Sequence, residues 1–267
     1  MNKRSFYTIM NLHLNKKIMA ILFCFAIIIL KAWGPTGHRV VGEVATQHIK
    51  KNTKRKIEKL LNHESLAAVS TFGDDIKSDA RYNAFYNWHF VNLSDNQKYN
   101  GEEHIEGDVL HGIQICVDTI KSKKTSTADK AFYLKLLVHF IGDLHQPLHV
   151  GHKEDKGGND IKVTWFKANS NLHRVWDENM IESYGMSYTE LTQNLPYADK
   201  EAIKNMQKGS VLDWGYESQQ LAQKVYQSAK NDEALGYAYQ YQNFSIVKSQ
   251  LQKGGLRLAK ILDEVFK

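Results

Sequence analysis

Apolar residues recur every three or four positions along most of the chain beyond residue 36, the spacing that gathers them on one face of an α-helix. The spacing predicts helices over residues 37–50, 53–62, 108–123, 129–146, 211–229 and 233–266, with more helix after residue 171. Residues 160–166 differ, because Ile161, Val163 and Trp165 alternate with polar residues after a Gly-Gly-Asn turn, as one strand of a small hairpin would. The pattern therefore predicts a mainly α fold, an all-α bundle with one small β-hairpin.

The composition supports this fold class. The 267 residues are 42% hydrophobic and 24% charged, a balance that excludes disordered, collagen-like and coiled-coil chains. Three prolines and 17 glycines are too few for the many turns of an all-β sandwich. Since no repeat, low-complexity tract or linker interrupts residues 33–267, we expect them to form a single helical domain.

The first 32 residues have the pattern of a signal peptide. A basic region reaches Lys17, and an apolar run of 13 residues follows from Ile18 to Leu30, with Lys31-Ala32 before a polar stretch. This run is too short to span a bilayer comfortably as a helix, although an uncleaved interfacial anchor is an alternative. We predict cleavage before Trp33, which would leave the protein secreted or periplasmic and without stable membrane insertion.

The basic character of the chain belongs mostly to this leader. The whole chain has 35 basic and 29 acidic residues, but five of the basic residues and none of the acidic ones lie in the first 32 positions. Residues 33–267 are therefore close to neutral, which argues against a surface that coats nucleic acid by charge alone. They also contain a single cysteine, Cys116, so no disulfide can form within them.

Histidine and aspartate recur at ligand spacing in two places. In the run HFIGDLHQPLH, His139 and Asp143 are four residues apart, so on a helix both side chains project from one face. His173 and Asp177 repeat this spacing in NLHRVWD. The proline of the first run disfavours helix at the residue before it, which lets His149 turn toward a neighbouring position.

One such pair is often only a hydrogen-bonded couple. Two pairs among apolar residues would bury several charges, at a cost that a bound cation offsets. Imidazole nitrogens together with carboxylate oxygens favour zinc, whereas calcium and magnesium prefer ligands that are all oxygen. The spacing therefore predicts a zinc site in the core of the bundle. For His145, between these ligands, support of a zinc-bound carboxylate and simple packing both remain open.

From Trp33 to at least Asp177 the chain resembles the S1/P1 nuclease family, zinc-dependent and mainly helical nucleases of single-stranded nucleic acid. The family pattern begins with a mature N-terminal Trp and a His five residues later, here in WGPTGH. An Asp follows in FGDDIKSD, and a His fifteen residues beyond it in NWHFVNL. All nine ligand positions of the family are matched in type and order, by Trp33, His38, Asp74, His89, His139, Asp143, His149, His173 and Asp177.

The resemblance implies three zinc ions per chain. One would be bound by Asp74, His89, His139 and Asp143; a second by the Trp33 amine and carbonyl, His38 and Asp143; and the third by His149, His173 and Asp177. Asp143 would then bridge the first two. Because a backbone amine binds a metal only when it is free and deprotonated, the second site would form only after cleavage immediately before Trp33.

The resemblance also implies roles in catalysis and substrate binding. Asp74 would orient the attacking water, and Lys77 would stabilise the pentacovalent oxyanion. A base would be stacked and hydrogen-bonded at positions matched by Phe90, Asn92, Gly157 and Asn159. Many fungal relatives have Asp in place of Asn92, and an amide donates as well as accepts hydrogen bonds, so the base preference does not transfer.

We therefore expect a monomeric endonuclease that cleaves single-stranded DNA and RNA to 5′-phosphorylated products and also acts on 3′-nucleotides. One alternative is a zinc phospholipase C, which shares the helical trinuclear framework but closes its last site with Glu and lacks the Gly-Gly-Asn hairpin. Another is a non-catalytic zinc-binding protein, which would need no base pocket beside the metals. Asp177 and the hairpin favour the nuclease over the phospholipase, and Phe90 and Asn159 disfavour the second alternative.

Overall fold

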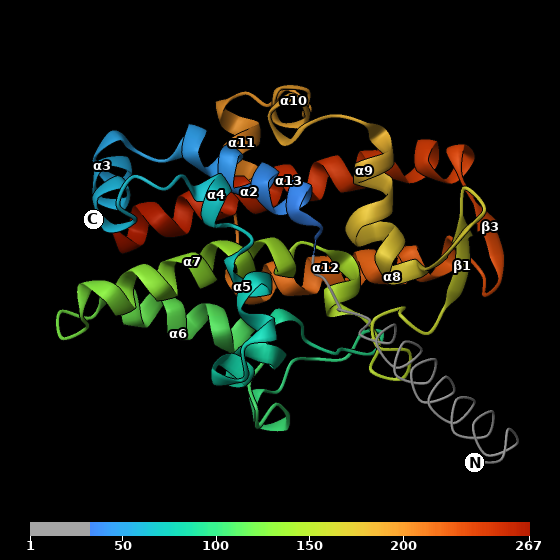
Figure 1. Ribbon diagram of the computed structural model, residues 1–267, viewed down its shortest axis with the longest axis horizontal. Helices are drawn as coiled ribbons and strands as arrows, with labels where there is room; N and C mark the ends of the chain where they lie inside the picture. Colours follow the sequence, from blue (N-terminus) through green and yellow to red (C-terminus); the bar gives the residue numbers. More distant parts are fainter. Residues whose placement is uncertain (1–32) are drawn as a thin grey trace, which may run out of the picture. The chain divides into compact units, whose positions relative to one another are not determined.

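The computed structural model describes residues 33–267, and these residues fold mainly into helices (Figure 1). The predicted signal peptide, residues 1–32, lies outside the described part of the chain. The five long helices are α2 (Pro35–His48), α6 (Val109–Lys121), α7 (Thr127–Leu144), α12 (Val211–Gln227) and α13 (Tyr237–Val265). Within residues 33–267, no helix combines the length and apolarity needed to cross a membrane.

Short helical segments connect the long ones. The α-helical ones are α3 (Lys51–Leu60), α4 (Leu66–Val69), α5 (Phe72–Asp75), α8 (Leu172–Arg174), α9 (Met180–Tyr184), α10 (Tyr188–Gln193) and α11 (Lys200–Met206). Turns of 3-10 helix occupy Ile76–Ser78, Ala80–His89, Gly101–Glu103 and Pro147–Val150, and a π-helical turn occupies Val175–Asn179. The predicted mainly α fold is confirmed, and most predicted helix ends lie within two residues of the observed ones.

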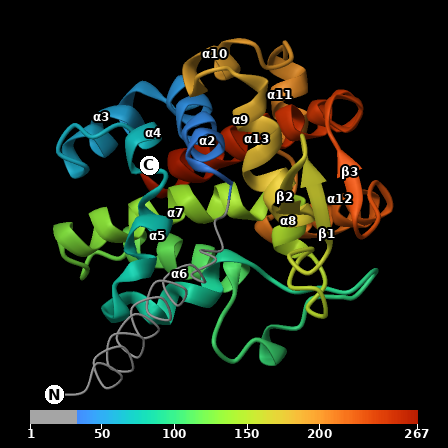
Figure 2. The same cartoon turned by 45° about the vertical axis from the view of Figure 1, so that its right-hand side comes forward.

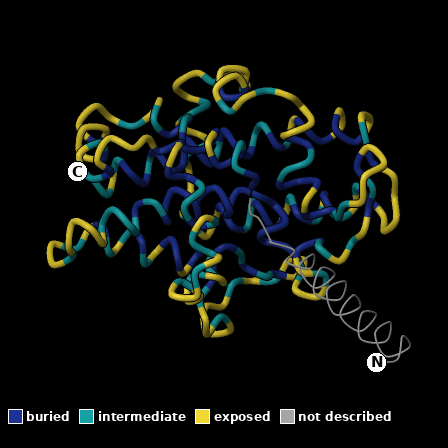
Figure 3. Tube along the Cα trace, viewed as in Figure 1, coloured by how far each residue is buried: buried dark blue, intermediate teal, exposed yellow. Residues whose placement is uncertain are grey.

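Helix α7 lies at the centre of the fold. It begins where the Ser126 side chain accepts a hydrogen bond from the Asp129 backbone N–H. It ends at Leu144, two residues before Gln146 becomes extended ahead of Pro147, as the steric restriction before a proline requires. Helix α6 packs along one side, while α2 and α13 pack against each other and against α7 on the other. The second half of α7 is buried throughout (Figure 3), so its polar side chains must find partners inside the protein.

The strands form one small sheet of order β2-β1-β3 beside α12 (Figure 2). Strands β1 (Lys162–Trp165) and β2 (Ala168–Asn171) form the predicted hairpin, in antiparallel register from Lys162 opposite Asn171 to Trp165 opposite Ala168. Strand β3 (Glu233–Leu235) pairs parallel to β1. The prediction of helix from residue 233 is wrong for these three residues, because their backbone pairs with the free edge of β1 and α13 begins only after Gly236.

His145 faces away from the other histidines and aspartates of its run. Its Nδ1–H donates to the Ile141 carbonyl oxygen, 2.7 Å away, and its Nε2 accepts from the Arg257 guanidinium at 2.9 Å. Burial and the positive charge of Arg257 lower the pKa of His145 to about 3. Of the two roles considered for this residue, the structure shows packing. The network extends to Glu217, which pairs with Arg257 and Lys253.

This network gives a prediction about acid stability. Although burial raises the pKa of Glu217, hydrogen bonds from Lys253 and Arg257 hold it below its usual value. We expect Glu217→Gln to lower the free energy of unfolding by about 2 kcal/mol at pH 7, because Arg257 is then left buried without an anionic partner. The carboxylate stabilises the fold above its unfolded pKa, so the deficit should shrink as the pH falls below about 4.5. Denaturant titrations at several pH values measure this loss of unfolding free energy. The substitution Glu182→Gln, at an exposed glutamate, is the control. An equal loss at pH 3 and pH 7 would contradict a role for the ionised Glu217 carboxylate.

Candidate metal centre

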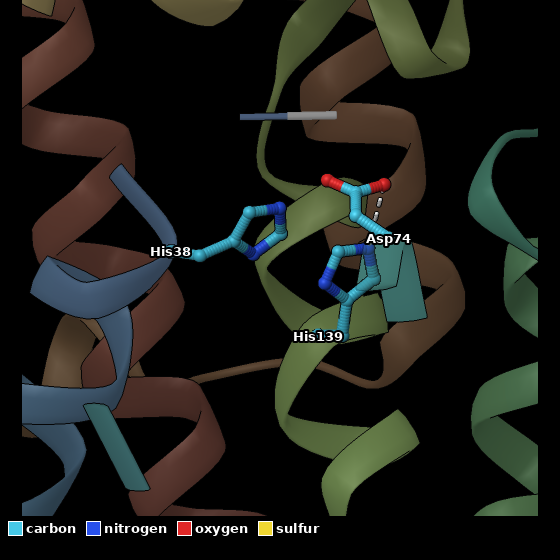
Figure 4. Close-up of side chains that lie close together, drawn as sticks. All are labelled: His38, Asp74 and His139. Carbon is cyan, nitrogen blue, oxygen red and sulfur yellow. Dashed lines mark ion pairs between the residues drawn. The ribbon is translucent and has the colours of Figure 1, made fainter. Parts of the chain in front are cut away.

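Three groups of histidine and aspartate side chains lie close together in the described part of the chain. Within each group the nearest nitrogen and oxygen atoms are all within 4.8 Å of one another. The groups are His38, Asp74 and His139 (Figure 4); His89, His139 and Asp143; and His149, His173 and Asp177. All eight side chains are buried except that of Asp74, which is partly exposed.

Asp143, fully buried on α7, belongs to the second group and also faces histidines of the first and third groups. Its Oδ2 lies 2.9 Å from Nδ1 of His89 and 3.2 Å from Nε2 of His139. Its Oδ1 lies 3.4 Å from Nε2 of His38 and 3.8 Å from Nδ1 of His149. Both oxygens of one carboxylate therefore face imidazoles that come from four other positions.

Two glycines allow the segments that carry these side chains to approach closely. A Cβ on Gly142 of α7 would lie only 2.7 Å from Nδ1 of His38 on α2. A Cβ on Gly73, which precedes Asp74 in α5, would overlap the imidazole of His139. Any larger residue at either position would push a ligand-bearing segment away from α7.

Backbone carbonyls fix the orientation of three imidazoles. The Nδ1–H groups of His139, His149 and His173 donate to the carbonyl oxygens of Ser70, His89 and Gly157, at 2.7, 2.7 and 2.6 Å respectively. With the proton held on Nδ1, each ring directs the lone pair of Nε2 toward the carboxylates. Metal-binding histidines are commonly fixed in this way, because the carbonyl sets both the tautomer and the ring orientation.

Several buried polar atoms of these groups have no hydrogen-bond partner within residues 33–267. They include both ring nitrogens of His38, Oδ1 of Asp143 and Nε2 of His149. An unsatisfied buried polar atom costs about 1–3 kcal/mol, so four at one place call for a compensating ligand. The donor set of imidazole nitrogens and carboxylate oxygens fits divalent zinc.

The pKa shifts also suit a cation. Burial, followed by the charge of Lys77, lowers the pKa of His89 to about 3 and keeps its ring neutral. Burial alone would raise the pKa of Asp177, but the neighbouring imidazoles of His173 and His149 lower it to about 2. Asp143 is likewise held well below its usual pKa, chiefly by His139 acting against burial. Ionised carboxylates thus face imidazoles at a place closed to bulk water.

Asp74 and Lys77, the predicted catalytic pair, contact each other directly. The Lys77 ammonium lies 2.7 Å from Oδ1 of Asp74, which is 3.7 Å from Nε2 of His139. A small pocket opens at this point, lined by Gly73, Ile76, Lys77, Tyr82, Asn83, Phe85, Tyr86 and His89. The pair therefore lies between the first two groups and the surface.

Trp33, the first described residue, is fully buried. The N–H of the next residue, Gly34, donates to the backbone carbonyl of Asp177 at 2.8 Å. A Cβ on Gly37 would lie 3.1 Å from the Trp33 Cβ, so this end of the chain packs against α2 and the π-helical turn. Trp33 and Gly34 thus lie beside segments that carry His38 and Asp177.

The predicted base-binding residues lie on two segments beside the third group. Phe90 and Asn92 follow His89, in a segment whose Val91 N–H donates to the carbonyl of His149. Both side chains are partly exposed. Gly157 contacts the third group directly, because its carbonyl oxygen accepts a hydrogen bond from Nδ1 of His173. The Asn159 side-chain amide instead donates to the Lys156 carbonyl at 2.8 Å.

The sequence analysis missed Gln146. Its side chain is fully buried and donates through Nε2 to Oδ1 of Asp177. The only signal of this contact in the sequence was the position of Gln146, which stands in the run HFIGDLHQPLH directly before a proline.

Comparison with known proteins agrees with this geometry. A family model described as S1/P1 Nuclease matches residues 33–267. The chain belongs to the S1/P1 nuclease family. It is accordingly an S1/P1-type endonuclease, a hydrolase, and the sequence-based prediction of family, enzyme class and helical fold is confirmed.

Three relatives illustrate the range of similarity of this S1/P1 nuclease. Endonuclease 3 of Arabidopsis thaliana is 32% identical over 265 residues, which cover 88% of this chain and 89% of the relative. Nuclease S1 of Aspergillus oryzae is 33% identical over 177 residues, covering 62% of this chain and 60% of the relative. Nuclease P1 of Penicillium citrinum is 25% identical over 264 residues, covering 87% and 97%.

Proposed function

We propose that this S1/P1 nuclease is a three-zinc phosphodiesterase that cleaves single-stranded DNA and RNA to 5′-phosphorylated products and also removes phosphate from 3′-nucleotides. The observation that carries the proposal is the contiguous set of buried histidines and aspartates, in which the Asp143 carboxylate faces histidines of all three groups. The zinc ligands would be the Trp33 amine and carbonyl, His38, Asp74, His89, His139, Asp143, His149, His173 and Asp177.

The chemistry that zinc supplies in such a site is Lewis-acid stabilisation of phosphoryl oxygens and activation of water for in-line attack on phosphorus. Asp74 accepts a hydrogen bond from the attacking water and so orients it. Lys77, held 2.7 Å from Asp74, places its positive charge where negative charge develops on the phosphoryl group. A small pocket beside this pair is lined in part by Lys77 and His89.

The preference for single-stranded substrates follows from the way an unpaired base would bind. Phe90 provides a stacking surface, and Asn92, Gly157 and Asn159 provide hydrogen bonds to the edge of a base. A base can stack on a side chain only when it is not paired within a duplex, which favours single strands. The near neutrality of residues 33–267 gives little additional attraction for a duplex backbone.

Residues 1–32 act as a signal peptide in this proposal, and cleavage before Trp33 releases a secreted or periplasmic monomer with one helical domain. The burial of Trp33 supports the cleavage position. So does the family match, which begins at that residue.

A single assay tests reaction, metal and polarity. Protein beginning at Trp33 and loaded with zinc is incubated with single-stranded and duplex oligonucleotides, with and without a chelator, and the phosphate-bearing end of each product is identified. We expect chelator-sensitive cleavage of the single strand that leaves 5′-phosphate. Chelator-resistant cleavage would overturn the metal mechanism. If zinc-loaded protein leaves every oligonucleotide intact, the nuclease proposal fails, and hydrolysis of phospholipid vesicles would then identify the phospholipase C alternative.

A further inference from the structure

Gln146 connects the end of α7 to the third group of ligands. Its Oε1 accepts a hydrogen bond of 2.5 Å from the Leu148 backbone N–H, and its Nε2 donates to Oδ1 of Asp177. The orientation of the amide is set by its surroundings, because a backbone N–H needs an acceptor and an ionised carboxylate needs a donor. A side chain without both functions could not satisfy the two partners.

The first consequence concerns Asp177. With Oδ1 occupied by the Gln146 amide, Oδ2 faces His173, whose Nε2 is 2.9 Å away. Nε2 of His149 lies 3.6 Å from Oδ1 and has no hydrogen-bond partner of its own within residues 33–267. Gln146 therefore holds the carboxylate in an orientation that presents Oδ1 to His149 and Oδ2 to His173.

The second consequence concerns His149. Gln146 precedes the short turn Pro147–Val150, and its side chain caps that turn at Leu148. Its backbone carbonyl accepts the His149 N–H at 3.0 Å. Pro147 has no N–H at the start of this turn, so the Leu148 N–H that the Gln146 side chain accepts is the first one in it. One side chain thus contacts one member of the third group and fixes the backbone that carries another.

We propose that Gln146 is the positioning residue of the third zinc site, setting its affinity separately from that of the other two sites. The inference rests on the proposed zinc function. Within the described residues, the Gln146 side chain has no hydrogen bond to His38, His89 or Asp143. Its backbone N–H donates to the Asp143 backbone carbonyl, a bond that does not depend on the side chain. Its loss should therefore weaken one site and spare the others.

The experiment compares Gln146→Met with Gln250→Met in the protein that begins at Trp33. Gln250 on α13 is also a buried glutamine, and its Nε2 donates to the His145 carbonyl at the end of α7, but it has no hydrogen bond to a proposed ligand among the described residues. Bound zinc is counted by mass spectrometry across a series of buffered free-zinc concentrations. Melting temperatures of the metal-free proteins report on structural loss alone.

We expect wild type and Gln250→Met to bind three zinc ions with the same affinities. In Gln146→Met one ion should bind roughly 10–100-fold more weakly, the range typical for removal of a group that orients a metal ligand, while two bind as in wild type. The metal-free melting temperature should fall further in Gln146→Met than in Gln250→Met, since Gln146 makes two side-chain hydrogen bonds, one of them to a buried carboxylate, and Gln250 makes one.

Each other outcome has a distinct meaning. Three wild-type affinities in Gln146→Met, or equal weakening of all three ions, would overturn the positioning role and leave the proposed function intact. A wild-type protein that binds no zinc would overturn the proposed function itself. If Gln146→Met does not fold, Gln146→Asn replaces it: the shorter amide cannot reach both partners, and the same selective weakening is expected.

Discussion

Replacing Asp143 by alanine should abolish phosphodiester cleavage. The two oxygens of this carboxylate lie between His38, His89 and His139, so its loss removes a ligand common to two proposed zinc sites. Lewis-acid stabilisation is worth several kcal/mol, and each 1.4 kcal/mol is a factor of about ten in rate, so the expected loss is several orders of magnitude. Initial rates on a single-stranded oligonucleotide measure it.

The same variant should be less stable in the presence of zinc. Ions that bind only the folded chain stabilise it by mass action, and Asp143→Ala forfeits that contribution at two sites. Its melting temperature should respond less to added zinc than that of wild type. Asp118→Ala, an exposed aspartate on α6, is the matched control and should behave as wild type in both assays. An Asp143→Ala protein with full activity would refute the shared-ligand assignment.

A single extra residue before Trp33 should lower phosphodiester cleavage almost as much as Asp143→Ala does. The extension turns the terminal amine into an amide, which is not a zinc ligand at neutral pH. Trp33 is fully buried and Gly34 is hydrogen-bonded to the Asp177 carbonyl, so the added residue must also be accommodated beside the metal centre. Loss of a group that only orients a metal ligand typically lowers activity roughly 10–100-fold. Loss of a ligand itself should therefore lower activity at least about 100-fold.

The control for the extension is its removal. A protein carrying a protease site that ends directly before Trp33 can be assayed before and after cutting, on the same preparation. We expect activity and one bound zinc ion to return on cutting, with little change in circular dichroism. Equal activity before and after would show that the terminal amine binds no metal.

Local patterns predicted the parts of the fold that depend on neighbours in sequence. Helical periodicity located α7, and the spacing of His139 and Asp143 on it gives the observed side-by-side placement. The pair His173 and Asp177 also comes together, even though a π-helical turn replaces the regular helix there.

What local patterns could not predict depends on distant partners. Strand β3 exists because β1 offers a free edge, and nothing within residues 233–235 signals that edge. The role of Gln146 depends on Asp177, which is remote in sequence, and the orientation of His145 depends on Arg257. The family resemblance supplied the remaining proposed ligands, because His38, Asp74 and His89 are single residues with no spacing pattern of their own.

The clustered imidazoles and carboxylates also bear on the stability that the proposed secreted protein would need. Secreted proteins commonly rely on disulfide bonds, yet Cys116 is the lone cysteine of residues 33–267. A metal ion bound to both His38 and Asp143 would tie together segments about 100 residues apart, a loop length for which a covalent crosslink is worth about 4–5 kcal/mol on the chain-entropy account. The bound ions would then stabilise the fold as disulfide bonds do in other proteins. Removal of zinc would lower the stability of the protein as well as its activity.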